Sequence, residues 1–230
     1  MCSAAFKAAY LKMLPEFERK TGHKIINAWG PAMGTTPQAV PNRIARGEPV
    51  DVVIVSGPAL EILINQGSVA AASRKNLAIS TIGAAVRTGS RRPDISTVEA
   101  FKLALERAKS IAYSDSVSGV YISTELYKKL GVSDAVRAKS KMILADPVGE
   151  VIASGGAELG FQQMSELKPV KGIDVIGPIP AEIQKVTMYA AGVSSKAEQP
   201  EAGAALIKYL ASPDVAAIVW GTGMTLPDDK

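Results

Sequence analysis

Apolar residues recur at helical spacing near the start of the chain and then gather into short continuous runs. Residues 4–22, AAFKAAYLKMLPEFERKTG, predict a helix that Gly22 ends and that Pro15 kinks or splits. The run DVVIVSG at residues 51–57 is apolar and β-branched, which is typical of a buried parallel strand. A short strand is predicted at residues 23–30, and PALEILINQG predicts a helix after the second strand. Because helices and strands alternate, the pattern indicates an α/β fold.

The same alternation continues through the rest of the chain. Ser96 and Glu99 form a capping box for a helix over residues 97–108. The helix predicted within VSGVYISTELYKKLG ends at Gly131. The remaining predicted elements are strands at residues 111–115, 141–145, 158–163 and 173–180, and helices at residues 133–139, 147–154, 200–210 and 212–220.

Two long extended stretches, at residues 77–89 and 185–195, enclose a middle block with its own α/β pattern. We interpret them as crossovers that join two lobes. Lobe 1 is predicted to be discontinuous, with residues 1–84 and 189–230. Lobe 2 is predicted to contain residues 85–188, with a ligand cleft between the lobes. A single sheet with long strands is the alternative that the pattern leaves open.

The charge and composition narrow the possible partners. The net charge of +4 is spread along the sequence, so we expect no nucleic-acid partner, which would need a basic face. A modest positive excess suits a small anionic ligand. No apolar run reaches the roughly 18 residues of a membrane span. We expect no signal peptide in this chain, and helix-like sequence starts so early that the first strand of lobe 1 should be largely missing.

The sequence holds few groups suited to catalysis. Its single cysteine and single histidine exclude an internal disulfide and a cysteine metal site, and His23 reads as an exposed loop residue. Cys2 lies near a helix start that could lower its pKa, but no base is evident nearby. The motifs GxSxG, HExxH and the P-loop are absent from the sequence. We therefore predict that the chain is not an enzyme and uses no cofactor or metal.

Small polar residues stand at four places just after a strand or just before a helix. Free N–H groups and partial positive charge at a helix start, supplemented by hydroxyls, can hold an anion without lysine or arginine. Thr36 is expected to cap a helix that Pro37 begins, and Asp115 is expected to form a turn with its side chain bonded to backbone N–H groups. Simple helix capping is the alternative for each hydroxyl taken alone. The four places are Ser3, residues 34–36, residues 116–120 and residues 146–149.

Several longer stretches resemble molybdate-type substrate-binding proteins of ABC importers. They are SAAFKAAYLKMLPEFERKTG, WGPAMGTTPQAVPNRIARGEPVDVVIVSG, SIAYSDSVSGVYISTELYKKLGV and GEVIASGGAELGFQQMSEL. The resemblance implies a type II periplasmic-binding-protein fold, with two mixed or parallel sheets flanked by helices and joined by two hinge strands. It also implies that neutral donors from several loops hold an oxyanion.

Carried over by position, the resemblance implies a set of ligand-binding residues. Gln163 stands where the molybdate binders typically carry a tyrosine, and it replaces a hydroxyl with an amide that can donate and accept. This departure, with the threonine-rich loop at residues 34–37, is typical of a divergent branch that binds another oxyanion or a small carboxylate. The implied residues are Ser3, Thr35, Thr36, Ser118, Gly119, Val148, Gly149 and Gln163.

The sequence thus predicts a solute-binding protein of an ABC importer that closes over a small anion. The resemblance implies a periplasmic location, a membrane permease as partner, and a monomer. One alternative is a ligand-sensing regulatory domain of the same fold, which would need a DNA-binding helix-turn-helix that the sequence does not show. The other is an α/β enzyme, which would need a base and a nucleophile in one cleft.

Overall fold

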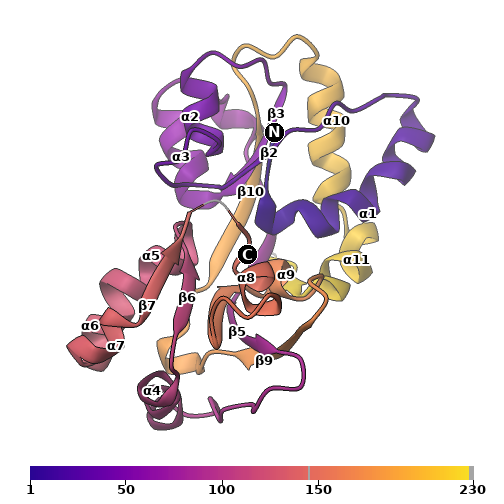
Figure 1. Cartoon of the computed structure of the whole chain (residues 1–230). Helices are drawn as coiled ribbons and strands as arrows, with labels where there is room; N and C mark the ends of the chain where they lie inside the picture. The colour runs from indigo at the N-terminus through magenta and orange to yellow at the C-terminus, as the bar shows by residue number, and fades with distance from the viewer. Residues whose placement is uncertain (145, 228–230) are drawn as a thin grey trace. The chain divides into compact units, whose positions relative to one another are not determined.

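The computed structural model describes residues 1–144 and 146–227, which form two compact units (Figure 1). Unit 1 contains Met1–Ser80 and Thr187–Lys230, of which residues 228–230 lie outside the described part of the chain. Unit 2 contains Thr81–Val186. The chain therefore leaves unit 1 once and returns to it once. The predicted fold class, α/β with two mixed sheets, is confirmed.

The sheet of unit 1 is mixed, and its described strands follow the order β11-β4-β10-β3-β1-β2. β1 pairs in parallel with β2 and β3, whereas β10 runs antiparallel to β3 and β4. A strand from the last part of the chain therefore lies in the middle of this sheet. The strands are β1 (Cys2–Ser3), β2 (Trp29–Gly30), β3 (Val52–Ser56), β4 (Lys75–Ser80), β10 (Thr187–Val193) and β11 (Met224–Thr225).

The first strand is as short as the sequence predicts, yet its backbone is fully engaged. The Met1 amine donates to the Val52 carbonyl at 2.7 Å, and the Cys2 N–H donates to the Ala28 carbonyl at 2.8 Å. The Ile54 N–H in turn donates to the Met1 carbonyl at 2.9 Å. These bonds hold the chain start inside the sheet, and burial lowers the pKa of the Met1 amine.

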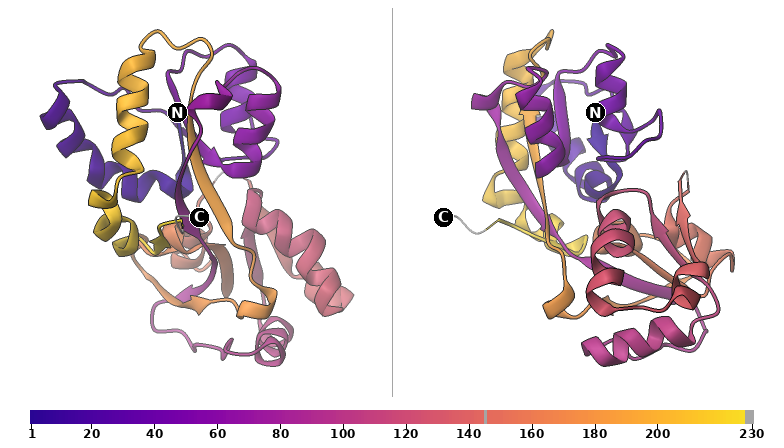
Figure 2. Two further views of the ribbon diagram at one scale, coloured as in Figure 1. Left: turned by 180° about the vertical axis from the view of Figure 1, so that it is seen from behind. Right: turned by 90° about the vertical axis from the view of Figure 1, so that its left-hand side faces the viewer.

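Helices cover the sheet of unit 1 and bury a core that includes Phe6, Met13, Leu60 and Leu210. α10 packs on β10 and on α1 (Figure 2). Pro15 lies inside one continuous helix, so the predicted split does not occur; buried residues on both sides of it hold the helix together. The helical elements are α1 (Ala4–Thr21), α2 (Val40–Ala45), α3 (Gly57–Asn65), η1 (Ala71–Ser73), α10 (Pro200–Leu210), η4 (Pro213–Val215) and α11 (Ala216–Gly221).

Within the described residues, no single helix is both long and apolar enough to cross a membrane. The bent pair Pro200–Leu210 and Pro213–Gly221 passes that test by length and composition taken together. Its apolar residues Leu206, Leu210 and Val219 belong to the buried core of unit 1. The apolar character of this pair is therefore explained by packing.

The sheet of unit 2 follows the order β7-β6-β8-β5-β9 among the described residues. β6 pairs in parallel with β7 and β8, and β5 pairs antiparallel with β8 and β9. The predicted strand at residues 141–145 is β7, and Ala145 lies outside the described residues. The strands are β5 (Ile82–Arg87), β6 (Ile111–Ser114), β7 (Ser140–Ile143), β8 (Leu159–Gln163) and β9 (Ile173–Pro178).

The helices of unit 2 surround a second core, in which the Phe101 and Phe161 rings lie 5.5 Å apart. α5, η2 and α6 form one continuous helical run with a π-helical middle, and Gly131 ends it in the left-handed conformation, as predicted. The helical elements are α4 (Val98–Arg107), α5 (Val117–Val120), η2 (Tyr121–Leu126), α6 (Tyr127–Leu130), α7 (Asp134–Ala138), α8 (Val148–Ala153), α9 (Met164–Leu167) and η3 (Ala181–Ile183).

The predicted capping box of α4 is wrong by one residue. Thr97 is the N-cap, and its hydroxyl accepts a hydrogen bond from the Ala100 N–H at 3.1 Å. Ser96 instead donates its backbone N–H to the Asp94 carboxylate at 2.9 Å. That contact holds Ser96 in the turn before the helix.

Candidate functional site

Parallel strands of unit 1 end at one edge of its sheet. Ser3, the last residue of β1, is in register with Gly30 at the end of β2. Ser56 is the last residue of β3, which pairs with β1. α1 begins directly after Ser3, and α3 begins directly after Ser56. This edge therefore collects the free N–H groups and partial positive charge of two helix starts.

The hydroxyls of Ser3 and Ser56 are buried without a hydrogen-bond partner among the described residues. Both serines hold the N-cap position with extended backbone, yet neither side chain accepts an N–H from the following turn. Simple capping therefore does not explain them. A buried polar group without a partner costs about 1–3 kcal/mol. Two such costs at one sheet edge indicate oxygens arranged for a group from outside the chain.

The loop after β2 places only one of the two predicted threonines inward. The prediction that Thr36 caps a helix beginning at Pro37 is wrong, because α2 begins at Val40. The Asn42 side-chain amide donates to the Thr36 carbonyl at 2.8 Å and so holds the loop off the helix axis. The Thr36 hydroxyl is buried without a partner in the described structure, whereas Thr35 is exposed.

Sequence reasoning missed Ser56 as a site residue. Its signal was available, because a serine that ends an apolar strand and precedes a helix is the pattern that singled out Ser3. Tyr189 of β10 is buried and in register with Ser56. No local pattern points to Tyr189, because this pairing joins strands that are distant in the sequence.

In unit 2, Ser114 ends β6, and Ser118 lies in the first turn of the helical run that follows. Their hydroxyl oxygens lie 3.3 Å apart, and both residues are buried. One hydroxyl donates to the other, which leaves the pair able to bind a further group. Gly119 allows this approach, because a Cβ there would lie 1.6 Å from the Ser114 carbonyl oxygen. Gly119 is therefore required for close packing, whatever it does for a ligand.

Asp115 directly follows β6, and Gln163 ends the neighbouring parallel strand β8 at the same level. Tyr113 is in register with Phe161, and each of the two polar residues comes two positions later. Asp115 is only 8% exposed, and its Oδ2 has no hydrogen-bond partner among the described residues. Burial raises the pKa of Asp115, opposed by the N–H of the same residue. The side chain thus bonds to a backbone N–H group, as expected, whereas Oδ2 has no partner among the described residues.

Val148 and Gly149 begin α8 and already have uses within the protein. The Val148 N–H donates to the Gln162 side-chain oxygen at 3.0 Å. A Cβ at Gly149 would lie 2.8 Å from a methyl carbon of Val170. A ligand that used the Val148 N–H would have to share it with Gln162, so these two positions carry less weight than Ser118 and Gln163.

The Gln162 amide also donates to the Glu166 carboxyl at 2.9 Å. Burial raises the pKa of Glu166 to about 7, and hydrogen bonds from Gln162 and from the Gln163 N–H oppose the rise. The side chain of Glu166 is thus held by its neighbours. Its role is to fix Gln162, which in turn fixes the start of α8.

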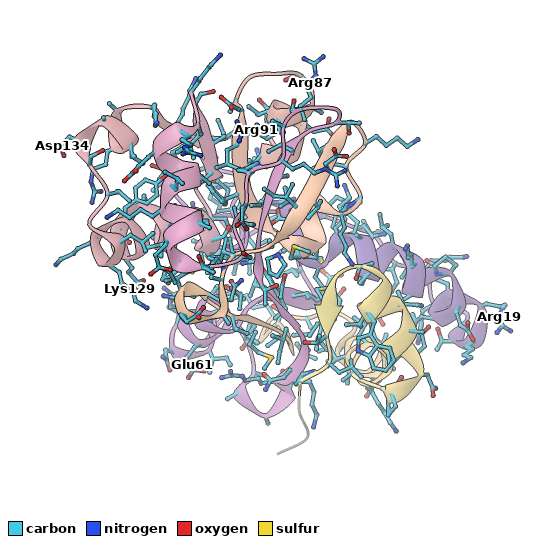
Figure 3. All side chains as sticks on the ribbon, turned by 90° about the horizontal axis from the view of Figure 1, so that it is seen from below. Arg19, Glu61, Arg87, Arg91, Lys129 and Asp134 are labelled. Carbon is cyan, nitrogen blue, oxygen red and sulfur yellow. The ribbon has the colours of Figure 1, made fainter. Side chains whose placement is uncertain are left out.

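The charged side chains labelled in Figure 3 all belong to exposed residues, and those of Arg19, Arg87 and Asp134 lie at the outer edge of the view. They include Arg91 and Lys129 of unit 2 and Arg19 of unit 1. The two sets of strand-end residues themselves contain no lysine or arginine. An anion bound there would be held by hydroxyls, amides and helix starts.

The other reactive groups lie elsewhere. Burial raises the pKa of Cys2 to about 12, so the suggestion that a helix start lowers it is wrong. His23 is exposed, as predicted, with its ring 6.2 Å from that of Phe17. In the described part of the chain, no group of three His, Cys, Asp or Glu side chains is placed to hold a metal ion.

Polar donors at strand ends in two α/β units of one chain are typical of proteins that bind a small solute. The sequence model of the bacterial extracellular solute-binding proteins matches residues 1–225, and the chain belongs to this family. It is thus a solute-binding protein of the ABC-transporter type, and the family implies a small ligand, a permease partner and a periplasmic location.

The names of individual relatives indicate different functions. The chain is 48% identical to an aconitate isomerase from Pseudomonas sp. over 224 residues, which is 97% of this chain and 86% of that protein. It is 25% identical to the molybdate-binding protein ModA of Azotobacter vinelandii over 97% of this chain and 88% of that protein. The solved periplasmic molybdate-binding protein of Azotobacter vinelandii matches with a TM-score of 0.77 at 21% identity, over 99% of this chain and all of that chain. The structural match confirms the type II periplasmic-binding-protein fold.

Proposed function

We propose that this protein binds a small polycarboxylate of the aconitate type. The observation that carries the proposal is the pair of buried, unpartnered hydroxyls of Ser3 and Ser56 at two helix starts. Such an arrangement suits a carboxylate, which accepts hydrogen bonds and is favoured by the positive end of the helix dipole. The 48% identity to an aconitate isomerase supports this choice of anion.

The residues of unit 2 favour a carboxylic ligand over molybdate. Burial raises the pKa of Asp115, and its Oδ2 has no hydrogen-bond partner among the described residues, so this carboxyl can exchange hydrogen bonds with a ligand carboxyl. Gln163 offers both a donor and an acceptor. A polycarboxylate offers several oxygen atoms to groups of this kind.

In this proposal unit 1 and unit 2 act as the two lobes predicted from the sequence. The ligand would stabilise a closed state, and a permease would recognise that state. The proposed contacts are Ser3, Thr36 and Ser56 in unit 1, and Ser118 and Gln163 in unit 2. The protein acts as a monomer in this scheme.

A second function is isomerisation of the bound ligand. The sequence by itself predicts no enzyme, and the family is one of binding proteins. The name of the 48% identical relative favours catalysis, and a buried carboxyl with a free oxygen is present at Asp115. Binding and isomerisation are compatible, because an enzyme must first hold its substrate.

A thermal-shift screen tests the binding proposal. The protein is heated with trans-aconitate, cis-aconitate, molybdate, tungstate, sulfate and phosphate in turn. A ligand at 100 times its dissociation constant adds about 2.7 kcal/mol to the free energy of unfolding, so an aconitate isomer should raise the melting temperature clearly. A rise with molybdate or tungstate and none with either aconitate would contradict the proposal.

Two substitutions test whether the candidate residues cause the rise in melting temperature with aconitate. Ser118→Ala and Gln163→Ala should each weaken aconitate binding, measured by calorimetry, while the far-ultraviolet circular dichroism stays that of the folded protein. A loss of about 1–3 kcal/mol in binding free energy is expected for each, since one hydrogen bond to a charged ligand is removed. Unchanged affinity in both variants would remove these residues from the site.

A further inference from the structure

Asp115 occupies an unusual position for a carboxyl. It directly follows β6 and precedes the helical run that begins at Val117. Its backbone is anchored, because its N–H donates to the Ile143 carbonyl at 3.2 Å. The side chain is more than nine-tenths buried, and Oδ2 has no hydrogen-bond partner among the described residues. The fold thus fixes the residue while leaving one carboxyl oxygen unused.

The surroundings of Asp115 are polar but provide no countercharge. Ser114 and Ser118 share a hydroxyl contact beside it, and Gln163 lies at the same level on the neighbouring strand. Asp115 takes part in no ion pair among the described residues. Burial without a countercharge raises the pKa of this carboxyl, which is the direction that suits a general acid–base group.

We infer that Asp115 is the acid–base residue that moves the proton when this protein isomerises aconitate, because its buried carboxyl presents an unpartnered oxygen among the polar strand ends of unit 2. This inference rests on the proposed binding of aconitate. It goes further in naming the residue that moves the proton.

The proton transfer balances without any other reactant. Aconitate carries a CH₂ group next to its carbon–carbon double bond, with a carboxylate on each of its three backbone carbons. The Asp115 carboxylate takes one CH₂ proton, and the electron pair of that C–H bond delocalises over the allylic carbons and carboxylates. The former double bond loses double-bond character and can rotate. Asp115, now protonated, returns the proton to an end carbon of the allylic system, which forms a C–H bond and restores a double bond.

Glu166 is the competing carboxyl in unit 2 because its pKa is also raised. Its oxygen, however, accepts from the Gln162 amide at 2.9 Å, and Gln162 is in turn bonded to the Val148 N–H. Glu166 is therefore committed to holding α8 in place. Among the described residues, the Asp115 Oδ2 has no such partner.

The test compares the intact protein with Asp115→Asn and Glu166→Gln. Each protein is incubated with trans-aconitate in deuterated water, and proton NMR records the cis-to-trans ratio and the loss of the CH₂ signal. The unsubstituted protein should isomerise aconitate and exchange its CH₂ protons. Asp115→Asn should lose at least about 100-fold in both rates, as expected for removal of a general acid–base group. Glu166→Gln should keep both activities.

Thermal shift with the same ligand separates this inference from the proposed function. Asp115→Asn should still be stabilised by aconitate, because an amide replaces the carboxyl at equal size. If Asp115→Asn does not fold, Asp115→Glu provides the second variant and should retain exchange, since the carboxyl is kept.

Three outcomes would overturn the inference. Isomerisation by Asp115→Asn within a few-fold of the unsubstituted rate would show that another group moves the proton, and loss in Glu166→Gln alone would identify that group. Aconitate binding by the unsubstituted protein without isomerisation or exchange would leave the binding proposal intact and remove the catalytic role. Absence of any aconitate shift in the unsubstituted protein would refute the binding proposal and this inference with it.

Discussion

At the scale of single residues, hydroxyls of the same chemical type have opposite roles in this protein. Thr97 accepts the Ala100 N–H and caps α4. Ser56 stands at the same position of α3 but makes no such bond. A sequence pattern identifies both as helix starts. The difference lies in where the hydroxyl points, and only Thr97 uses it to stabilise the fold.

This difference predicts that two substitutions have opposite effects on stability and on ligand affinity. Thr97→Ala should lower the free energy of unfolding by about 1 kcal/mol, the usual worth of an N-cap, without changing ligand affinity. Ser56→Ala should leave the stability of the free protein nearly unchanged but weaken aconitate binding. Urea unfolding and calorimetry measure the two quantities. Equal losses of stability in both variants would mean that Ser56 is a cap after all.

Glu166 predicts a pH dependence of stability at the same scale. Its pKa is about 7 in the folded protein, against an ordinary value of 4.5 that we take for the unfolded chain. Between pH 4.5 and 7 the folded chain therefore binds more protons at this group than the unfolded chain does. The stabilisation from this group is fully present below about pH 4.5 and is lost as the pH rises toward 7. Melting temperatures across this range should therefore fall more steeply for the unsubstituted protein than for Glu166→Gln. Parallel curves would contradict the assignment.

At the scale of elements, the short strand β1 limits how well unit 1 is packed. A groove of about 650 Å³ adjoins Met1 and is lined by Tyr10, Ile25, Val50 and Leu206, among others. The Met1 amine is buried there, and the burial lowers its pKa. The groove is also lined by Ala28 and Val52, whose carbonyls accept from the first residues of the chain.

Extending β1 by a few apolar residues before Met1 should therefore stabilise the protein. The added residues would bury apolar surface in the groove and replace a buried amine by an amide. Burial of one aliphatic side chain is worth about 1.5–3 kcal/mol, which corresponds to a rise of roughly 5 °C in melting temperature for a chain of this size. An extension of equal length made of Gly and Ser is the matched control. Equal melting temperatures for the two extensions would contradict the packing argument.

At the scale of the whole molecule, the two units differ in how their residues are distributed along the sequence. Unit 2 is one continuous segment with its own sheet and core. Unit 1 needs residues from both ends of the chain, because β10 lies between β3 and β4. The first part of unit 1 therefore lacks a central strand until the last part of the chain joins it.

We expect the fragment of residues 81–186 to fold alone and residues 1–80 not to. Loss of β10 would expose the backbone groups and apolar faces of both β3 and β4. Circular dichroism and urea titration of the two separate fragments measure this. A cooperative transition in residues 1–80, or none in residues 81–186, would contradict the expectation.

Much of the fold could be predicted locally, because strong periodicity and capping residues leave few alternatives. α10 begins and ends at the predicted residues, and Gly131 ends the long helical run as expected. The start of α2 differs from the predicted one, and a contact from the Asn42 side chain to the Thr36 carbonyl, which the local pattern does not indicate, lies in the loop before it. The sequence identifies Ser3 and Thr36 as candidates by residue type and position, whereas the lack of partners for their hydroxyls is a property of the assembled unit.

The sequence by itself determined that this chain is an α/β protein with small polar residues at its helix starts and a likeness to anion-binding proteins. Periodicity and capping are local properties, so they can be identified before the chain is folded. Only the tertiary structure decided which polar groups remain without partners, and it singled out Ser56 and the Oδ2 of Asp115. Burial and hydrogen bonding depend on neighbours that are distant in the sequence, and the pKa of a carboxyl depends on both.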